Sequence, residues 1–78
     1  MINNPAQKRP FDLLNRSIDK NVTVGIKGGK EFTGKMESFD VHMNIILVNA
    51  SFKDGENKKE FKNIFLRGDS VIYISPVE

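Results

Sequence analysis

Two short segments of the sequence gather the side chains that could do chemistry. Residues 40–44 place a carboxylate, an imidazole and a carboxamide within five positions, at Asp40, His42 and Asn44. Residues 67–69 add a guanidinium and a second carboxylate, at Arg67 and Asp69. A single-stranded base binds to flat groups on which it can stack and to polar groups at its edge. The residue types alone do not establish that these segments bind a base, because a lone histidine in a β-turn is more often structural.

The sequence contains few residues that could support catalysis, metal binding or phosphate binding. There is one histidine and no cysteine, so neither a cysteine nucleophile nor a zinc site is expected. The serines have no recognisable elbow or base partner, and no phosphate-binding glycine loop is present. Residues 67–69 match an adhesive tripeptide, but three residues are a weak signal, and adhesion is not expected of an intracellular chain with no signal peptide. A turn between two strands explains them. We therefore expect no catalysis, no metal and no cofactor.

Length and charge set limits on the partners. A chain of 78 residues forms one small domain, and such domains usually need disulfides, a metal or oligomerisation. Without cysteine, oligomerisation is the expected support. The formal net charge of +2 permits a polyanionic partner without requiring one. No apolar run is long enough for a membrane span, and the first residues lack the apolar stretch of a signal peptide. We expect an intracellular, cytoplasmic protein with no membrane partner.

The hydrophobic pattern predicts a short helix followed by five strands, a single domain over residues 10–78. Residues 1–9 are polar and are expected to form a flexible arm. Pro10 suits the first position of a helix that ends between residues 17 and 20. The period then changes to two, and the expected strands cover residues 22–26, 31–40, 45–52, 58–66 and 71–74. Short turns at residues 27–30 and 54–57 favour a small antiparallel barrel or sandwich.

Some expectations concern single residues. Gly34 marks a sharp bend in the second strand, and Gly68 supplies a special backbone geometry to its turn. The mostly apolar third strand is expected to be covered on both faces, and Pro76 to stop the last strand. Phe39 and Tyr73 are expected to pack across subunits. The expected core or interface positions are Phe11, Leu13, Leu14, Val22, Val24, Ile26, Phe32, Met36, Ile45, Leu47, Ile64, Val71 and Ile74.

An open barrel leaves edge strands that a protein must pair or protect. Pairing the final strand of one copy with an edge of the next would remove both edges. A repeated head-to-tail contact closes into a ring where the rotation permits. The pattern makes such a ring plausible without establishing it.

Two motifs resolve the reading of the polar segments. Residues 32–44, with Phe32-Thr33-Gly34 and Asp40-Val41-His42-Met43-Asn44, resemble the first motif of the Sm and Sm-like (LSm) family. Residues 64–71, around Arg67-Gly68-Asp69, resemble the second motif. The resemblance extends over residues 10–76, and the compact form with His42 is most similar to archaeal Sm-like proteins.

The resemblance implies a short helix on a strongly bent five-stranded antiparallel sheet. It implies that subunits join the fourth strand to a neighbour's fifth strand, usually in a homoheptamer, and bind uridine-rich single-stranded RNA at the central pore. Hexamers of Hfq-type relatives have a different second motif, which favours seven subunits here. The residues implied for the pocket are His42, Asn44, Arg67 and Asp69, with Asp40 behind them. Gly68 belongs to the same loop, and Met43 is expected to pack rather than to contact a base.

Our hypothesis for selectivity concerns the Asn44 amide. Uracil is sandwiched between the His42 ring and the Arg67 guanidinium. The Asn44 amide forms hydrogen bonds with the N3–H donor and the O4 acceptor at the edge of the uracil. A freely flipping amide would accept cytosine too. Asp40, which only accepts when ionised, would hold the amide NH2 and fix its orientation. A backbone N–H of Gly68 or Asp69 could then reach O2.

Two alternatives remain at this stage. One is a non-specific single-strand binder on an OB-like or SH3-like barrel, which would show exposed aromatic platforms and leaves the paired motifs unexplained. The other is a structural ring that scaffolds other proteins without sequence-specific RNA. Replacing His42 separates them, because RNA binding should fall while the ring survives.

Overall fold

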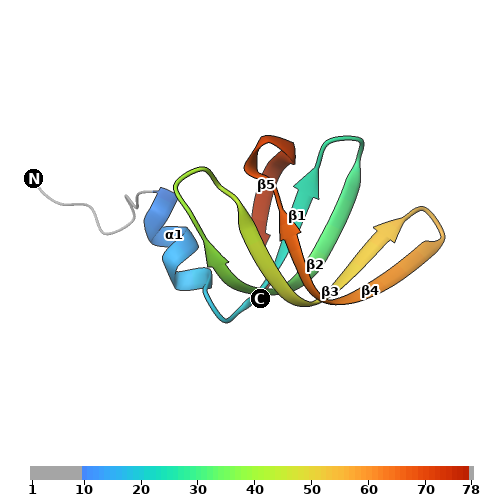
Figure 1. Ribbon diagram of the computed structural model, residues 1–78, viewed down its shortest axis with the longest axis horizontal. Helices are drawn as coiled ribbons and strands as arrows, with labels where there is room; N and C mark the ends of the chain where they lie inside the picture. The colour runs from blue at the N-terminus through green and yellow to red at the C-terminus, as the bar shows by residue number, and fades with distance from the viewer. Residues whose placement is uncertain (1–9, 78) are drawn as a thin grey trace, which may run out of the picture.

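The computed structural model describes residues 10–77, and the expected flexible arm at residues 1–9 lies outside them. The elements follow in the order α1 (Pro10–Ser17), β1 (Asn21–Ile26), β2 (Lys30–Phe39), β3 (Ile45–Asp54), β4 (Asn57–Leu66), the 3-10 turn η1 (Gly68–Ser70) and β5 (Val71–Pro76). The predicted fold class, a short helix followed by a bent five-stranded antiparallel sheet, is confirmed (Figure 1).

Helix α1 begins at Pro10, whose missing N–H has no partner to lose in the first turn. It ends at Ser17, where the side-chain hydroxyl donates to the carbonyl of Leu13 at 2.9 Å. Leu14 is the apolar residue that the helix buries. Phe11 and Leu13 are 45% and 41% exposed. The sequence predicts a position in the core or at an interface for both residues, and this exposure excludes the core.

The sheet has the strand order β4-β3-β2-β1-β5. Each neighbouring pair is antiparallel, and β5 returns to pair with β1 rather than with β4. The outer edges of β4 and β5 are therefore the two open edges of the sheet. In Figure 1 the β3–β4 hairpin extends away from the end of the sheet that carries α1.

The sheet bends where small residues allow the strands to approach. Between Thr33 and Lys35 the register of β2 against β3 shifts, at Gly34. A Cβ atom on Gly34 would lie 2.8 Å from the Cα of Ala50, so only glycine fits there. Next to Ala50, Asn49 adopts a left-handed backbone with φ of 50°. The register irregularity at Gly34 is consistent with the predicted bend, and the close contact with β3 requires glycine there.

β1, β2 and β4 each begin one residue before the predicted position, and the ends of β2, β3 and β5 also differ from the prediction. β2 ends at Phe39, so Asp40 belongs to the following turn. β3 continues to Asp54, and its second half is largely exposed, so the expected cover on both faces is wrong. β5 runs on to Pro76, which lies opposite Val22. Proline is tolerated there because β5 is an edge strand, where one side needs no ladder hydrogen bond.

The core is formed by buried side chains of the strands together with Leu14 of α1. Its centre is formed by side chains that are less than 2% exposed, Val22, Val24, Met36, Ile45 and Leu47. Ala50 and Leu66 also belong to it, although the sequence pattern did not single them out. Phe39 is partly buried and stacks on Phe11 with ring centroids 6.0 Å apart.

Candidate nucleic-acid interface

The turn that joins β2 to β3 is organised by the side chain of Asp40. Its Oδ1 accepts the backbone N–H groups of His42, at 2.9 Å, and of Asn44, at 3.0 Å. The backbone closes the same turn, since the N–H of Met43 donates to the carbonyl of Asp40 at 2.9 Å. Met43 takes a left-handed backbone with φ of 66° and packs against the core, as expected for a packing residue. The turn therefore holds the exposed His42 on a fixed backbone.

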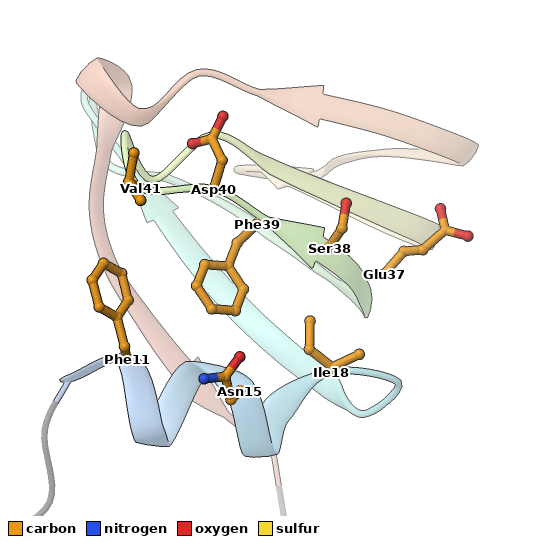
Figure 2. A pocket seen from close by; sticks show the side chains of 8 residues that line it. All are labelled: Phe11, Asn15, Ile18, Glu37, Ser38, Phe39, Asp40 and Val41. Carbon is orange, nitrogen blue, oxygen red and sulfur yellow. The ribbon is translucent and has the colours of Figure 1, made fainter.

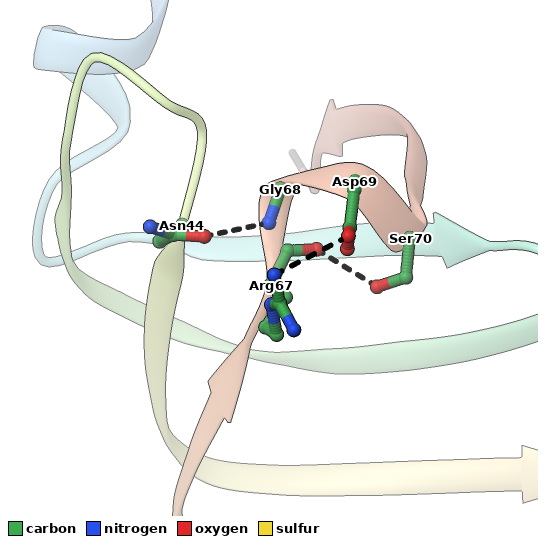
Figure 3. A network of polar contacts seen from close by, with 5 residues as sticks. All are labelled: Asn44, Arg67, Gly68, Asp69 and Ser70. Atoms are coloured by element: carbon green, nitrogen blue, oxygen red, sulfur yellow. Dashed lines mark hydrogen bonds and ion pairs between the residues drawn. The ribbon is translucent and has the colours of Figure 1, made fainter.

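The side-chain amide of Asn44 is held at both ends. Its Nδ2 donates to Oδ2 of Asp40 at 3.1 Å, and its Oδ1 accepts the backbone N–H of Gly68 at 2.7 Å (Figure 3). A carboxylate can only accept and a peptide N–H can only donate, so the reverse orientation of the amide would lose both bonds. The predicted bond from Asp40 is present, and Gly68 supplies a second that we did not expect.

Gly68 is required by a close approach between two loops. A Cβ atom at this position would collide with the carbonyl oxygen of His42 and would lie 3.0 Å from the carbonyl carbon of Met43. The positive-φ glycines among residues 10–77 are Gly28, Gly29 and Gly55. The special backbone geometry expected at Gly68 is therefore wrong, and the reason for glycine there is space.

The second loop holds Arg67 beside Asp69. The guanidinium and the carboxylate approach to 3.4 Å, and both side chains are about 70% exposed. An exposed pair of this kind contributes about 0–1 kcal/mol, so it orients Arg67 more than it stabilises the fold. The hydroxyl of Ser70 donates to the carbonyl of Arg67 at 2.8 Å and closes the 3-10 turn (Figure 3).

A cavity of about 490 Å³ opens where the two loops meet. It is lined by His42, Asn44, Phe65, Arg67, Gly68 and Asp69. Five of these residues were expected from the sequence. Asp40 and Met43 stand behind the lining, one through its hydrogen bonds and the other through packing. Sequence reasoning missed Phe65, although its position two residues before Arg67 on an extended strand places both side chains on one side.

The carboxyl of Asp40 is stabilised in its ionised form. Loss of solvent around it acts to raise its pKa, but the bonds from the Asn44 side chain and from the N–H groups of Asn44 and His42 act the other way. The nearby His42 adds a small electrostatic effect in the same direction. The result is a pKa below the ordinary value of 3.8, so Asp40 is an acceptor throughout the neutral range.

A second cavity, of about 420 Å³, lies between α1 and the end of β2 (Figure 2). Phe11, Phe39 and Val41 are among its lining residues, and Asp40 stands at its rim. Figure 2 shows the Asp40 carboxylate directed away from the two aromatic rings. Of the expected site residues only Asp40 borders this cavity, so it is separate from the cavity around His42.

Two other kinds of feature, a metal site and a membrane-spanning helix, are not found in residues 10–77. Within residues 10–77 no three His, Cys, Asp or Glu side chains come together as metal ligands would. The helices in the same range include none with the length and apolar character needed to cross a membrane.

Known proteins are similar to this chain in sequence and in fold. The LSM domain family profile matches residues 12–76. An snRNP Sm-like protein of Methanosarcina acetivorans is 45% identical over 69 residues, 87% of this chain and 96% of that one. The Sm protein of Pyrococcus abyssii, in complex with a uridine heptamer, is 44% identical with a TM-score of 0.84, covering 90% of this chain and 100% of that one.

A third comparison extends the likeness at lower identity. The Sm-like heptamer of P. aerophilum has a TM-score of 0.86 at 32% identity, covering 94% of this chain and 99% of that one. The family profile spans most of the chain, and the relatives match it over nearly their full lengths. The chain therefore belongs to the LSM domain family of Sm-like proteins.

Proposed function

We propose that this chain binds single-stranded, uridine-rich RNA as one subunit of a homomeric ring. The observation that carries the proposal is the Asn44 amide, fixed by Asp40 and Gly68 at the wall of a cavity that His42 and Arg67 also line. The uridine heptamer bound by the P. abyssii relative, 44% identical, supports the choice of ligand. We assign the chain a binding role without catalysis, as a single Sm-like domain over residues 10–78, in the cytoplasm.

Uracil binds between the His42 ring and the Arg67 guanidinium. Each stacked base is worth on the order of 1–3 kcal/mol, whatever its identity. Selectivity comes from Asn44, which after its bonds to Asp40 and Gly68 still has one N–H for O4 and one oxygen lone pair for the N3–H. Cytosine presents the opposite pattern at this edge and is penalised.

The contact at the uracil O2 needs a backbone N–H donor from the second loop. The sequence offers Gly68 or Asp69 for it. The N–H of Gly68 already bonds to Asn44 at 2.7 Å, so the N–H of Asp69 is the donor that we now assign to O2. Asp69 then contributes its backbone to the base and its carboxylate to Arg67.

The ring forms by pairing of the two open sheet edges. β4 and β5 are the outer strands of the sheet, and unpaired edges of this kind seek partners. Ile72, 63% exposed on β5, is an apolar residue that such pairing would cover. A β4 edge joined to the β5 edge of the next copy is a head-to-tail contact, which closes into a ring. The heptamer of the P. aerophilum relative supports seven subunits.

The test replaces His42 with alanine and measures the affinity for heptauridine alongside the ring mass by native mass spectrometry. Loss of one stacking face should weaken binding by about tenfold or more while the ring survives. Val41→Ala is the matched control, since Val41 is exposed in the same turn but does not line the cavity. An intact ring whose heptauridine affinity does not change would support a scaffold and refute the pocket.

Phosphate contacts add a dependence on salt. For single strands, the logarithm of the affinity falls with the logarithm of salt concentration with a slope of about −0.7 per neutralised phosphate. Lys27, Lys30, Lys58, Lys59 and Lys62 are exposed and supply candidate contacts near two hairpin turns. A titration of heptauridine at several salt concentrations gives the number of phosphates that the ring neutralises.

A further inference from the structure

Phe65 is an aromatic side chain that the uridine pocket does not use. It lies on β4 with 58% of its surface exposed, and it lines the same cavity as His42 and Arg67. Its neighbour Leu66 is buried in the core, at 6% exposed. The alternation along the strand thus turns Leu66 inward and Phe65 outward. An exposed phenyl ring at the wall of a nucleotide cavity is a surface on which a base can stack.

The spacing from Phe65 to Arg67 suits one planar ring. β4 ends at Leu66, and Arg67 continues in extended backbone with φ of −77° and ψ of 139°. Residues two apart on an extended chain project to the same side and lie about 6.6 Å apart. Two stacking contacts at a carbon–carbon separation of about 3.5 Å add up to about the same distance. A base can therefore enter between the phenyl ring and the guanidinium.

We propose that Phe65 is a second base-stacking residue, which holds one more base beside the uridine of the His42 pocket. This inference rests on the proposed RNA-binding function and extends it. A phenyl ring offers no hydrogen bond, so the second position accepts any nucleobase. The cavity, at about 490 Å³, lies in the range of sites that hold ligands larger than a single pyrimidine.

Pairing between subunits does not cover the phenyl ring of Phe65. Strand addition at β4 uses hydrogen bonds that run in the plane of the sheet. The side chain of Phe65 stands perpendicular to that plane, as strand side chains do. The register supports this direction, since Phe65 pairs with Ile46 while the inward-facing Leu66 pairs with Ile45. The phenyl face is thus left to the cavity.

The experiment compares two RNAs on the intact ring. One is heptauridine, which reports on the uridine pocket. The other is a longer RNA in which uridine alternates with 2-aminopurine, whose fluorescence is quenched when it stacks. The variants are Phe65→Leu, which keeps apolar bulk without a flat ring, and Phe65→Tyr, which keeps the ring. Val77→Ala is the control, as an exposed apolar residue outside this cavity.

We expect Phe65→Leu to lose about tenfold more affinity for the alternating RNA than for heptauridine, and to show less quenching. Phe65→Tyr should restore both properties, and Val77→Ala should retain them. Unchanged quenching and affinity in Phe65→Leu would overturn this inference alone. Loss of the ring in Phe65→Leu would also overturn it, by making Phe65 a subunit contact. Failure of the unmodified ring to bind heptauridine would instead defeat the proposed function.

Discussion

The peptide N–H of Gly68 donates to the side-chain oxygen of Asn44 at 2.7 Å, across 24 positions of the chain. The carboxylate of Asp40 holds the nitrogen of the same amide at 3.1 Å. One side chain thereby ties the β2–β3 turn to the β4–β5 turn. The two motifs are coupled through Asn44 before any ligand arrives, so the edge that reads a base is already oriented.

Replacing Asp40 with asparagine should reduce selectivity more than affinity. An asparagine at this position can donate as well as accept, so it no longer forces the Asn44 nitrogen toward it. One hydrogen bond is worth about 0.5–1.5 kcal/mol, which corresponds to a loss of up to about tenfold in the preference for uridine over cytidine. Titrations with heptauridine and heptacytidine measure that ratio.

The matched control for this variant is Asp69→Asn, which removes a carboxylate from the other loop and leaves the Asn44 amide bonds in place. It should alter the salt dependence, because Arg67 loses its ion-pair partner, while the ratio of the two affinities stays the same. Equal losses for both oligomers in Asp40→Asn would refute the idea that this carboxylate fixes the amide.

Gly68→Ala should break the junction between the two loops. The added methyl group collides with the carbonyl oxygen of His42, so the loops must separate and the bond from Gly68 to Asn44 lengthens. We expect heptauridine affinity to fall by about tenfold or more, because both the orientation of Asn44 and the position of His42 change. Isothermal titration alongside thermal unfolding measures both affinity and stability.

Gly28→Ala provides the comparison, because it makes the same substitution in a different setting. Gly28 has open space around a Cβ, but its φ of 91° is unfavourable for alanine. A left-handed residue of this kind costs roughly 1–2 kcal/mol of stability. Gly28→Ala should therefore unfold more easily and bind RNA normally once folded, and a comparable loss of affinity in both variants would argue against a local effect at Gly68.

The sequence was sufficient for the fold where the hydrophobic period was clear. Alternation at Val22 and Val24 predicted a half-buried strand, and both are fully buried. The sequence pattern failed to predict exposure and strand ends where these are set by tertiary contacts. The exposure of the second half of β3 depends on how the chain packs around it, and the continuation of β5 to Pro76 depends on its position at an edge. Neither property is encoded in the local pattern.

The same distinction holds for the residues of the site. Residue types and motifs predicted His42, Asn44 and Arg67, and the structure brings them to one cavity, although their roles in RNA binding stay predictions. The need for glycine at position 68 could not be assigned correctly, because the crowding comes from the carbonyl of His42 in the other loop. Phe65 was missed because an apolar residue in a strand suggests a core position, and only its spacing of two residues from Arg67 points to the cavity.

Acid should loosen the β2–β3 turn at a pH below the ordinary range of an aspartate. The folded pKa of Asp40 is lower than 3.8, since hydrogen bonds from Asn44 and His42 outweigh the effect of desolvation. Its contribution is therefore fully present above the unfolded value and is lost as the pH falls through the folded one. NMR shifts of the His42 and Asn44 amide protons should follow this titration, and a midpoint above 3.8 would contradict it.

Alkali should act at a different residue, Tyr73 of β5. Its hydroxyl donates to the carboxylate of Glu31. The Tyr73 ring lies against Gly25, where an added Cβ would collide with it. The bond to Glu31 raises the pKa of Tyr73 above its ordinary value of 10.0, and desolvation and the charge of Glu31 act in the same direction. The contribution of this bond to stability is present below pH 10.0 and is lost as the pH rises through the folded value.

The titration of Tyr73 is directly measurable, because it is the only tyrosine and the chain has no tryptophan. Tyrosinate absorbance should show a single transition above pH 10.0. Glu31→Gln removes the charge and weakens the acceptor, so the transition should move down toward the ordinary value. Glu60→Gln removes an exposed carboxylate on β4 and should leave it in place. If the two variants titrate alike, the hydrogen bond between Tyr73 and Glu31 does not hold the phenol in its protonated form.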